Sequence, residues 1–281
     1  MSTRLTVTHR TGYAYEKGAL TSYNEARLIP PTTTEQAVMY SRVEITPKPW
    51  TYDYTDYWGT HVTAFEVHDR HTELVVTASS TVEIDRPPRV GAQLSWAQLH
   101  ADASSAETCE FLELSPRVLP PADLHDRVLA MAAAAASPAV FVDEVMHLIH
   151  DEVDYVTGST DVAGHAADAW LKRAGVCQDM AHLALGALRD VGIPARYVSG
   201  YVLPGSDIPV GDTVTGESHA WVEWWDGAWL GFDPTNLLVP RDQHIEVAHG
   251  RDYADVAPLT GVFTGGSTTG MFVEVDITRL R

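Results

Sequence analysis

The sequence predicts an α+β protein, in which an all-β, sandwich-like region precedes a core where helices pack on an antiparallel sheet. In roughly the first 85 residues, apolar and polar side chains alternate in short runs separated by turn residues, as they do in half-buried strands. From about residue 123 the apolar residues recur at helical spacing, and the strand pattern returns after residue 194. This order of elements is typical of the α+β class.

Four runs near the N-terminus predict strands, because they alternate and are rich in Val, Thr, Tyr and Phe. They are "RLTVTHRTGYAY", "QAVMYSRVEITP", "HVTAFEVHD" and "TELVVTASSTVEI", and the turn segments "IPPTTT", "TPKPW" and "DYWGT" separate them. The proline-rich "DRPPRV" then marks a boundary. We therefore assign residues 1–86 to a β-sandwich-like domain and residues 87–125 to a helical connection.

The remaining residues, 126–281, are expected to form a second domain that begins with helices. Helical spacing appears in "FVDEVMHLIHDEVDY", in "AADAWLKRAG" and in "GVCQDMAHLALGALRDVG", whose Met180, Leu183 and Leu188 define one apolar face. The segments "ARYVSGYVL", "SHAWVEWW", "AWLGFDPTN" and "MFVEVDITRL" predict strands. The Gly- and Pro-rich segment 203–217 is expected to be a loop that could act as a lid over the site.

Composition argues against several kinds of partner and cofactor. A net charge of −19 opposes binding to nucleic acid or to an anionic membrane surface. No apolar run is long enough to span a bilayer, and no export signal is visible, so a cytoplasmic location is expected. Neither C-x-x-C nor H-E-x-x-H occurs, so no metal or cofactor is predicted. A homo-oligomer is compatible with these features.

Cys177 is the candidate nucleophile, because it stands in the first turn of a predicted helix. The unpaired N–H groups and the positive end of the helix dipole both stabilise a thiolate there, and the same N–H groups could hold an oxyanion. Asp179 adds a negative charge close by, so a cationic partner is needed. The alternative is a packing role, which most free cysteines on apolar helices have. Cys109 lacks this context and is expected to be structural.

Among the 13 histidines, His219 is the preferred partner for Cys177. His219 begins a strand that shares a hairpin with "GFDPTN", which supplies Asp233. A thiol, an imidazole and a carboxylate can serve as nucleophile, base and orienting group. His182 lies off the face of the helix that carries Cys177. Five further histidines are expected at the surface or in loops: His147, His150, His165, His244 and His249.

The hairpin loop decides whether His219 and Asp233 can meet, because a one-residue slip exchanges the two faces of a strand. A two-residue turn at Asp226 and Gly227 would put Asp233 on the opposite face from His219. A three-residue loop, 225–227 with Gly227 left-handed, pairs His219 with Asp233 and gathers the apolar side chains on the other face. We predict this second register on packing grounds.

These segments together resemble the bacterial branch of the transglutaminase-like superfamily. The resemblance lies in "GVCQDMAHLALGALRDVGIPARYVSGY" with "SHAWVEWW" and "WLGFDPTN", in the N-terminal "NEARLIPP" and "DYWGTHVTAFEVHDRHTELVVTASS", and in "HIEVAHGRDYADVAPLTGVFTGG". It implies a papain-like core, in which a helix bearing the nucleophile packs on an antiparallel sheet bearing His and Asp. Residue by residue, it assigns Cys177, His219 and Asp233 to a catalytic triad.

The sequence identifies the oxyanion donors and the substrate contacts less closely than it identifies the triad. Animal transglutaminases use a tryptophan upstream of the cysteine, but the nearest one here, Trp170, lies inside an apparent helix and is not given that role. The backbone N–H of Cys177 is the expected donor, with Tyr155 or the Gln178 side chain as helpers. Trp221 shares the polar face of the hairpin with His219 and is expected to contact substrate.

The expected activity is cleavage of a peptide or carboxamide bond through a thioester on Cys177, with a peptide or protein as substrate. Water as the second substrate makes the protein a peptidase or amidohydrolase, which is the preferred hypothesis. An amine as acceptor makes it a protein-glutamine transglutaminase. Two less favoured hypotheses are an idle binding module with the same fold, and acyl transfer to a small arylamine, which the N-terminal β domain fits poorly.

Overall fold

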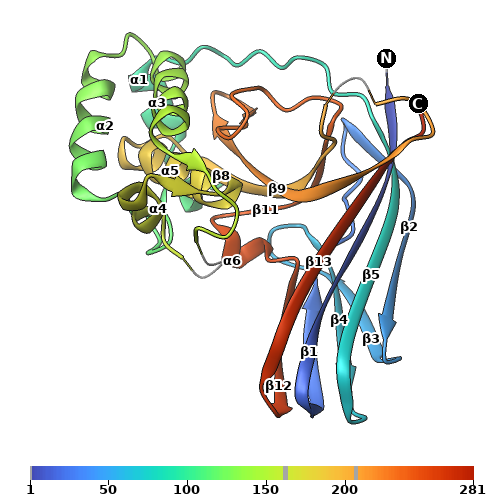
Figure 1. Ribbon diagram of the computed structural model, residues 1–281. Helices are drawn as coiled ribbons and strands as arrows, with labels where there is room; N and C mark the ends of the chain where they lie inside the picture. Colours follow the sequence, from blue (N-terminus) through green and yellow to red (C-terminus); the bar gives the residue numbers. More distant parts are fainter. Residues whose placement is uncertain (1, 161–163, 206–207) are drawn as a thin grey trace.

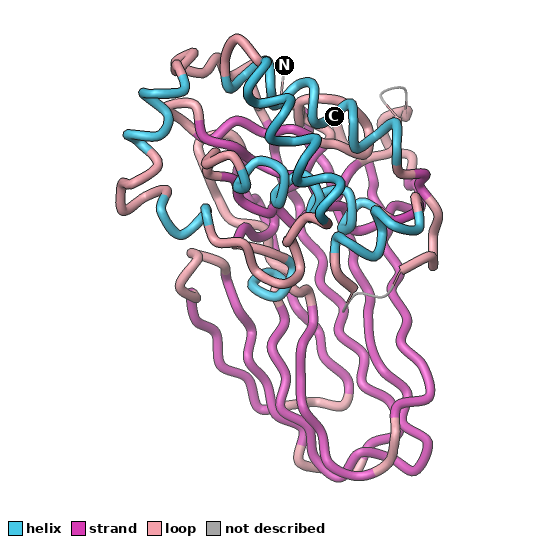
Figure 2. Tube along the Cα trace, turned by 90° about the vertical axis from the view of Figure 1, so that its left-hand side faces the viewer, coloured by secondary structure: helices cyan, strands magenta, loops and turns pink. Residues whose placement is uncertain are grey.

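The computed structural model describes residues 2–160, 164–205 and 208–281. Helices gather at one end of the molecule, and long strands extend away from them to the other end (Figures 1 and 2). The predicted α+β class is confirmed. No helix in the described ranges is both long and apolar enough to cross a membrane.

The N-terminal strands form a curled antiparallel sheet around the long strand β1 (Thr3–Ala26). The first half of β1 pairs with β5 (His71–Ile84) and its second half with β4 (His61–Val67), while β2 (Gln36–Thr46) and β3 (Trp50–Thr55) extend the sheet. Buried apolar side chains, among them Phe65, Leu74 and Val76, give this region its own core. The four predicted strands are present, and β3 is an additional strand that begins within the expected turn "TPKPW".

Two strands from the far end of the chain complete this sheet. Strand β13 (Thr268–Arg279) pairs with the first half of β1, and β12 (Leu259–Gly265) pairs with the second half. The last strand was expected in the second domain, but it belongs to the N-terminal sheet because Val275 and Ile277 bury their side chains beside β1. The boundaries expected at residues 86 and 125 stay predictions.

The helices surround one buried helix, α5 (Cys177–Asp190). Helices α2 (Ala122–Ala134), α3 (Pro138–Glu152) and α4 (Ala166–Lys172) pack on one side of it, and strands of a second sheet lie on the other. Every residue from 178 to 189 is therefore buried, so the single apolar face predicted for this helix was too narrow. The smaller elements are α1 (Trp96–Asp102), the 3-10 helix η1 (Cys109–Leu112), β6 (Asp154–Tyr155), β7 (Ala174–Gly175) and α6 (Tyr253–Val256).

The second sheet has the strand order β11-β8-β9-β10, with β8 at Ala195–Val202, β9 at Thr213–Trp225, β10 at Trp229–Phe232 and β11 at His244–Gly250. Strand β9 joins the two sheets: residues 213–216 pair with β13, and residues 217–224 pair with β8. The loop expected at 203–217 is thus shorter, because 213–217 is strand. The lid hypothesis falls partly on residues 206–207, which lie outside the described residues.

The hairpin between β9 and β10 has a three-residue loop, as predicted, but the loop is 226–228 rather than 225–227. Trp225 pairs with Trp229, so His219 and Asp233 are not direct cross-strand partners. They still share a face, because an odd-length loop preserves the alternation. Asp226 explains the shift: its carboxylate is buried and accepts the backbone N–H groups of residues 93 and 94, at 3.0 and 2.7 Å, which holds it out of the strand.

The substitution Asp226→Ala removes two hydrogen bonds to a buried charge, and is expected to lower the free energy of unfolding by about 3 kcal/mol. Urea denaturation followed by circular dichroism measures this. Asp69→Ala is the matched control, because Asp69 is an exposed aspartate in the loop between β4 and β5. Equal stability of the two variants would show that the 91–94 segment does not anchor the hairpin loop.

Candidate active site

Cys177 is the first residue of α5, and the backbone before it is arranged so that the helix can begin there. Asp179 caps the helix, since its Oδ2 accepts the N–H of Val176 at 2.8 Å. Gly175 permits this approach, because a Cβ there would lie 2.8 Å from the Cβ of Asp179. The first hydrogen bonds of the helix run from the N–H groups of Asp179 and Met180 to the carbonyl of Val176. Cys177 comes before them, half-buried and in no disulfide.

The negative charge of Asp179, which opposes a thiolate at Cys177, is partly suppressed. Burial raises the pKa of the Asp179 carboxyl, although hydrogen bonds from Thr160 and the Val176 N–H act in the other direction. A carboxyl that is less readily ionised opposes a neighbouring thiolate less. Asp179 is therefore mainly a structural cap for the helix that carries Cys177.

His219 lies beside Cys177, because β9 packs on α5. The sulfur of Cys177 is 4.0 Å from the carbonyl oxygen of Ser218, the residue before His219. His219 Nε2 is 2.7 Å from Asp233 Oδ2, so Nδ1 is the ring nitrogen left to face the thiol. Burial alone lowers the pKa of His219, but hydrogen bonds and charges from Asp233 and Cys177 raise it to about 10. A protonated imidazole is thus held next to the candidate nucleophile.

Asp233 sits fully buried in a ring of hydrogen-bond donors. Its Oδ2 accepts from His219 and from Asn236 Nδ2 at 2.8 Å, and its Oδ1 accepts from the backbone N–H groups of Thr235 and Asn236 at 2.9 and 3.2 Å. Burial tends to raise the pKa of Asp233, but these bonds and the nearby imidazoles hold it well below its usual range. The carboxylate is ionised and fixed in place, which lets it orient His219.

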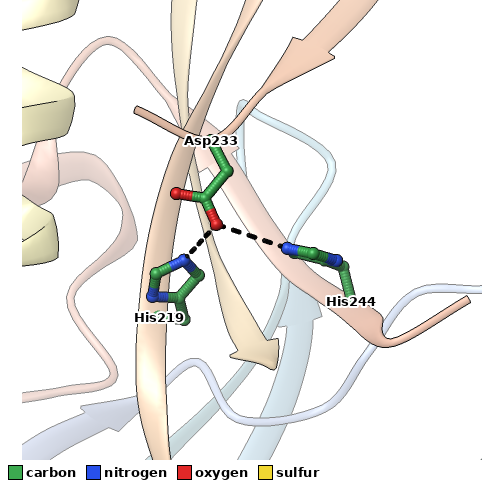
Figure 3. Close-up of side chains that lie close together, drawn as sticks. All are labelled: His219, Asp233 and His244. Carbon is green, nitrogen blue, oxygen red and sulfur yellow. Dashed lines mark hydrogen bonds and ion pairs between the residues drawn. The ribbon is translucent and has the colours of Figure 1, made fainter. Parts of the chain in front are cut away.

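His244 is the residue that the sequence interpretation missed. It was expected at the surface or in a loop, but it lies on β11, fully buried, with Nε2 3.4 Å from Asp233 Oδ2 (Figure 3). Its Nδ1 accepts the N–H of Arg241 at 3.3 Å, so the ring proton is on Nε2 and points at Asp233. Burial lowers the pKa of His244, which keeps it a neutral donor. The alternation in "HIEVAHG" was the available signal for a strand.

His219, Asp233 and His244 each offer one atom that could ligate a metal ion, and these three atoms lie within 4.8 Å of one another. The hydrogen bonds argue otherwise. A metal at His244 Nε2 would require the proton to move to Nδ1, where it would meet the N–H of Arg241. The cluster therefore fits a hydrogen-bonded carboxylate better than a metal centre.

The three expected substrate contacts do not lie together. Tyr155 and Gln178 line the cleft that contains Cys177 and His219, a cavity of about 370 Å³. Tyr155 is half-exposed and donates its hydroxyl to Glu217 at 3.2 Å, and burial with the nearby Cys177 charge raises its pKa. Trp221 is buried behind His219, with ring centroids 6.3 Å apart, and lines a separate cavity. Its place indicates that it packs the imidazole rather than touching substrate.

Both regions of the chain are similar to known protein families. A model of the bacterial transglutaminase-like N-terminal region matches residues 5–83, and a model of the transglutaminase-like superfamily matches residues 126–234, which include Cys177, His219 and Asp233. An uncharacterized protein of Mycobacterium leprae is 44% identical over 280 residues, covering 99% of each chain. His244 and Asn236 lie beyond the second match.

Two further similarities differ in extent. A protein-glutamine gamma-glutamyltransferase of Pseudomonas aeruginosa is 32% identical over 140 residues, which is 45% of this chain and 21% of that protein. The crystal structure of a candidate cysteine protease from Cytophaga hutchinsonii superposes with a TM-score of 0.80 at 22% identity, covering 100% of this chain and 92% of that one. The structural similarity extends over both sheets and shows a shared fold.

The raised pKa of His219 predicts a specific pH dependence of folding stability. A group with a higher pKa in the folded state stabilises the fold fully below its unfolded value, near 6.5, and loses that contribution as the pH rises through its folded value, about 10. The difference in unfolding free energy between the wild type and His219→Gln should therefore shrink from pH 6 to pH 10. Urea denaturation at several pH values measures it. Asp233→Asn, which removes the partner charge, should flatten the dependence, and an unchanged slope would contradict this account.

His244 is expected to act as a positioning residue for Asp233. His244→Leu removes one donor to a buried carboxylate and should slow alkylation of Cys177 by iodoacetamide about tenfold at neutral pH. His244→Gln retains an N–H donor and should stay within about threefold of the wild type. The unfolding free energy of both variants is measured alongside. If His244 had only a structural role, the alkylation rates of the two variants would follow their unfolding free energies, whether or not the N–H donor is retained.

Proposed function

The chain belongs to the transglutaminase-like superfamily, and from this membership we propose that it is a cysteine-dependent enzyme that cleaves a peptide or carboxamide bond through a thioester. The observation that carries the proposal is the alignment of three groups: a thiol at a helix N-terminus, an imidazole beside it, and a buried carboxylate 2.7 Å from that imidazole. An idle binding module would have no need to keep a buried charge pair aimed at a thiol.

The first half of the reaction forms the thioester. Cys177 and His219 form an ion pair, in which the thiol proton resides on His219 Nδ1, and the thiolate attacks the substrate carbonyl carbon. The carbonyl oxygen takes up the negative charge and is stabilised by the backbone N–H of Cys177, with Gln178 or Tyr155 as a second donor. When the tetrahedral intermediate collapses, the C–N bond breaks and His219 donates its proton to the leaving amine or ammonia.

The second half removes the acyl group. His219 accepts a proton from water, the resulting hydroxide attacks the thioester, and the carboxylic acid is released as the Cys177 thiolate and protonated His219 are restored. We favour water as the acceptor because it enters an open cleft without a binding site of its own, whereas an amine must be bound. Transfer to an amine is the second candidate, since the Pseudomonas aeruginosa relative named above is a glutamyltransferase.

Asp233 contributes through His219. Its bond to Nε2 keeps that nitrogen protonated, so Nδ1 is the position that gains and loses a proton during the reaction. Trp221 stacks on the ring and His244 holds the carboxylate, so both limit the rotation of the pair. The cytoplasmic location and the peptide or protein substrate expected from the sequence remain part of this proposal.

Iodoacetamide at pH 6 tests the nucleophile, because an ordinary thiol, with a pKa near 8.5, is almost wholly protonated there. Cys177 is expected to react at least ten times faster than the exposed Cys109, as read by peptide mass spectrometry. Unfolding in urea, or the variant His219→Ala, should remove this difference. Reaction of the two thiols at equal rates in the folded protein would refute an activated Cys177.

Turnover distinguishes the two acceptors. A mixture of peptides is incubated with and without an added primary amine, and ammonia and new termini are measured. We expect new termini without amine, and a loss of activity of about 10⁴-fold or more in Cys177→Ala. Formation of an amide with the added amine, in place of free acid, would assign the transferase activity.

A further inference from the structure

The cleft around Cys177 has two walls from different parts of the fold. One wall comes from the helical end and includes Tyr155, Gln178 and Tyr253. The other comes from β1 and β13 of the N-terminal sheet. Figure 1 shows β13 and β1 running side by side, and β9 leading from the second sheet to β13.

The wall from the N-terminal sheet is a ladder of cross-strand pairs. Tyr13 pairs with Met271, Thr11 with Val273 and His9 with Val275, and all six residues line the cleft. Residues two apart on a strand share a face, and these pairs are spaced about 7 Å apart along it. We call the outer two pairs, Tyr13, Met271, Thr11 and Val273, the ladder wall.

The ladder wall is exposed where its β13 residues face the open cleft. Met271 is 56% and Val273 46% exposed, whereas the innermost residue of the same strand, Val275, is 2% exposed. Val275 pairs with Gly216, three residues before His219, so the inner pair links the ladder wall to the strand that carries His219, and the wall runs outward from there. A largely apolar strip that lines the same cleft as Cys177 and is open to solvent along β13 is suited to a substrate side chain.

Charge narrows the class of substrate. Among the described residues that line the cleft, the ionisable side chains are those of Cys177, two histidines, four tyrosines and Glu217. Glu217 is the only carboxylate among them. Its carboxylate is exposed at the rim, where it accepts the Tyr155 hydroxyl. The protein as a whole carries a net charge of −19. An acidic side chain on the ladder wall would meet this repulsion, while an aromatic or aliphatic one would bury its apolar surface.

We propose that the ladder wall is the specificity subsite of the enzyme, and that it selects peptides with an aromatic or long aliphatic side chain next to the bond attacked by Cys177. This inference rests on the proposed function and adds a substrate class to it. The N-terminal sheet is then part of the substrate site. Met271 is well suited to this role, because a flexible thioether adapts to aromatic rings of different shape.

Peptidyl chloromethyl ketones test the subsite, because they report side-chain binding through alkylation of the thiol and require no natural substrate. The three reagents are the acetyl-Ala-Phe, acetyl-Ala-Leu and acetyl-Ala-Glu chloromethyl ketones. The second-order rate of modification of Cys177 is followed by intact-protein mass spectrometry, and each rate is divided by the iodoacetamide rate of the same variant. We expect the Phe and Leu reagents to react 10- to 100-fold faster than the Glu reagent.

Two variants that add a positive charge test whether the ladder wall causes this preference. Val273→Arg and, as a second exposed position, Met271→Arg should each reduce the Phe-to-Glu rate ratio at least tenfold. Val262→Arg is the matched control: Val262 is a 69% exposed valine on β12 of the same sheet, outside the cleft, and the ratio should be unchanged.

The outcomes separate the two proposals. Equal rates for the three reagents, a preference for Glu, or a ratio that neither ladder-wall variant changes would each overturn the ladder wall as the subsite, while an activated Cys177 would stand. Failure of Cys177 to react faster with iodoacetamide than Cys109 would overturn the proposed function itself.

Discussion

The buried hydrogen bond between His219 and Asp233 is the interaction on which the rest of the site depends. Asp233 is an ionised carboxylate removed from water, and an unpaired charge in such a place would cost several kcal/mol. The surrounding donors, from the 235–236 backbone, Asn236 and His244, make the charge tolerable. The same donors fix the direction of the carboxylate, so the imidazole can face the thiol in one orientation.

Strand β9 explains why a protein with two sheets can behave as one enzyme. Its first residues pair with β13, its central part carries His219 beside α5, and its end forms the hairpin that presents Asp233. A hydrogen-bonded strand is a stiff connection, so the N-terminal sheet is held at a set position relative to Cys177. This continuity places the wall formed by β1 and β13 across the cleft from the helical wall.

The comparison of sequence and structure is most instructive at the hairpin. Alternation correctly indicated that His219 and Asp233 share a face, because parity depends only on whether the loop length is odd. The register itself was wrong, because it depends on a contact between Asp226 and the distant segment 91–94. His244 was missed for a related reason: the local pattern around it shows a strand, but not that its ring meets Asp233 rather than solvent.

The sequence by itself determined the strands and helices with strong periodicity, the start of the helix at Cys177, and the residue types able to form a thiol–imidazole–carboxylate set. These follow from local rules of backbone geometry and side-chain alternation. The tertiary structure alone decided that β12 and β13 complete the N-terminal sheet, that Trp221 and His244 support His219 and Asp233, and that β1 forms part of the cleft. Each of these depends on pairing between segments far apart in the chain. A local sequence pattern shows that a strand or helix has a face to bury, but it does not indicate which distant segment will cover that face.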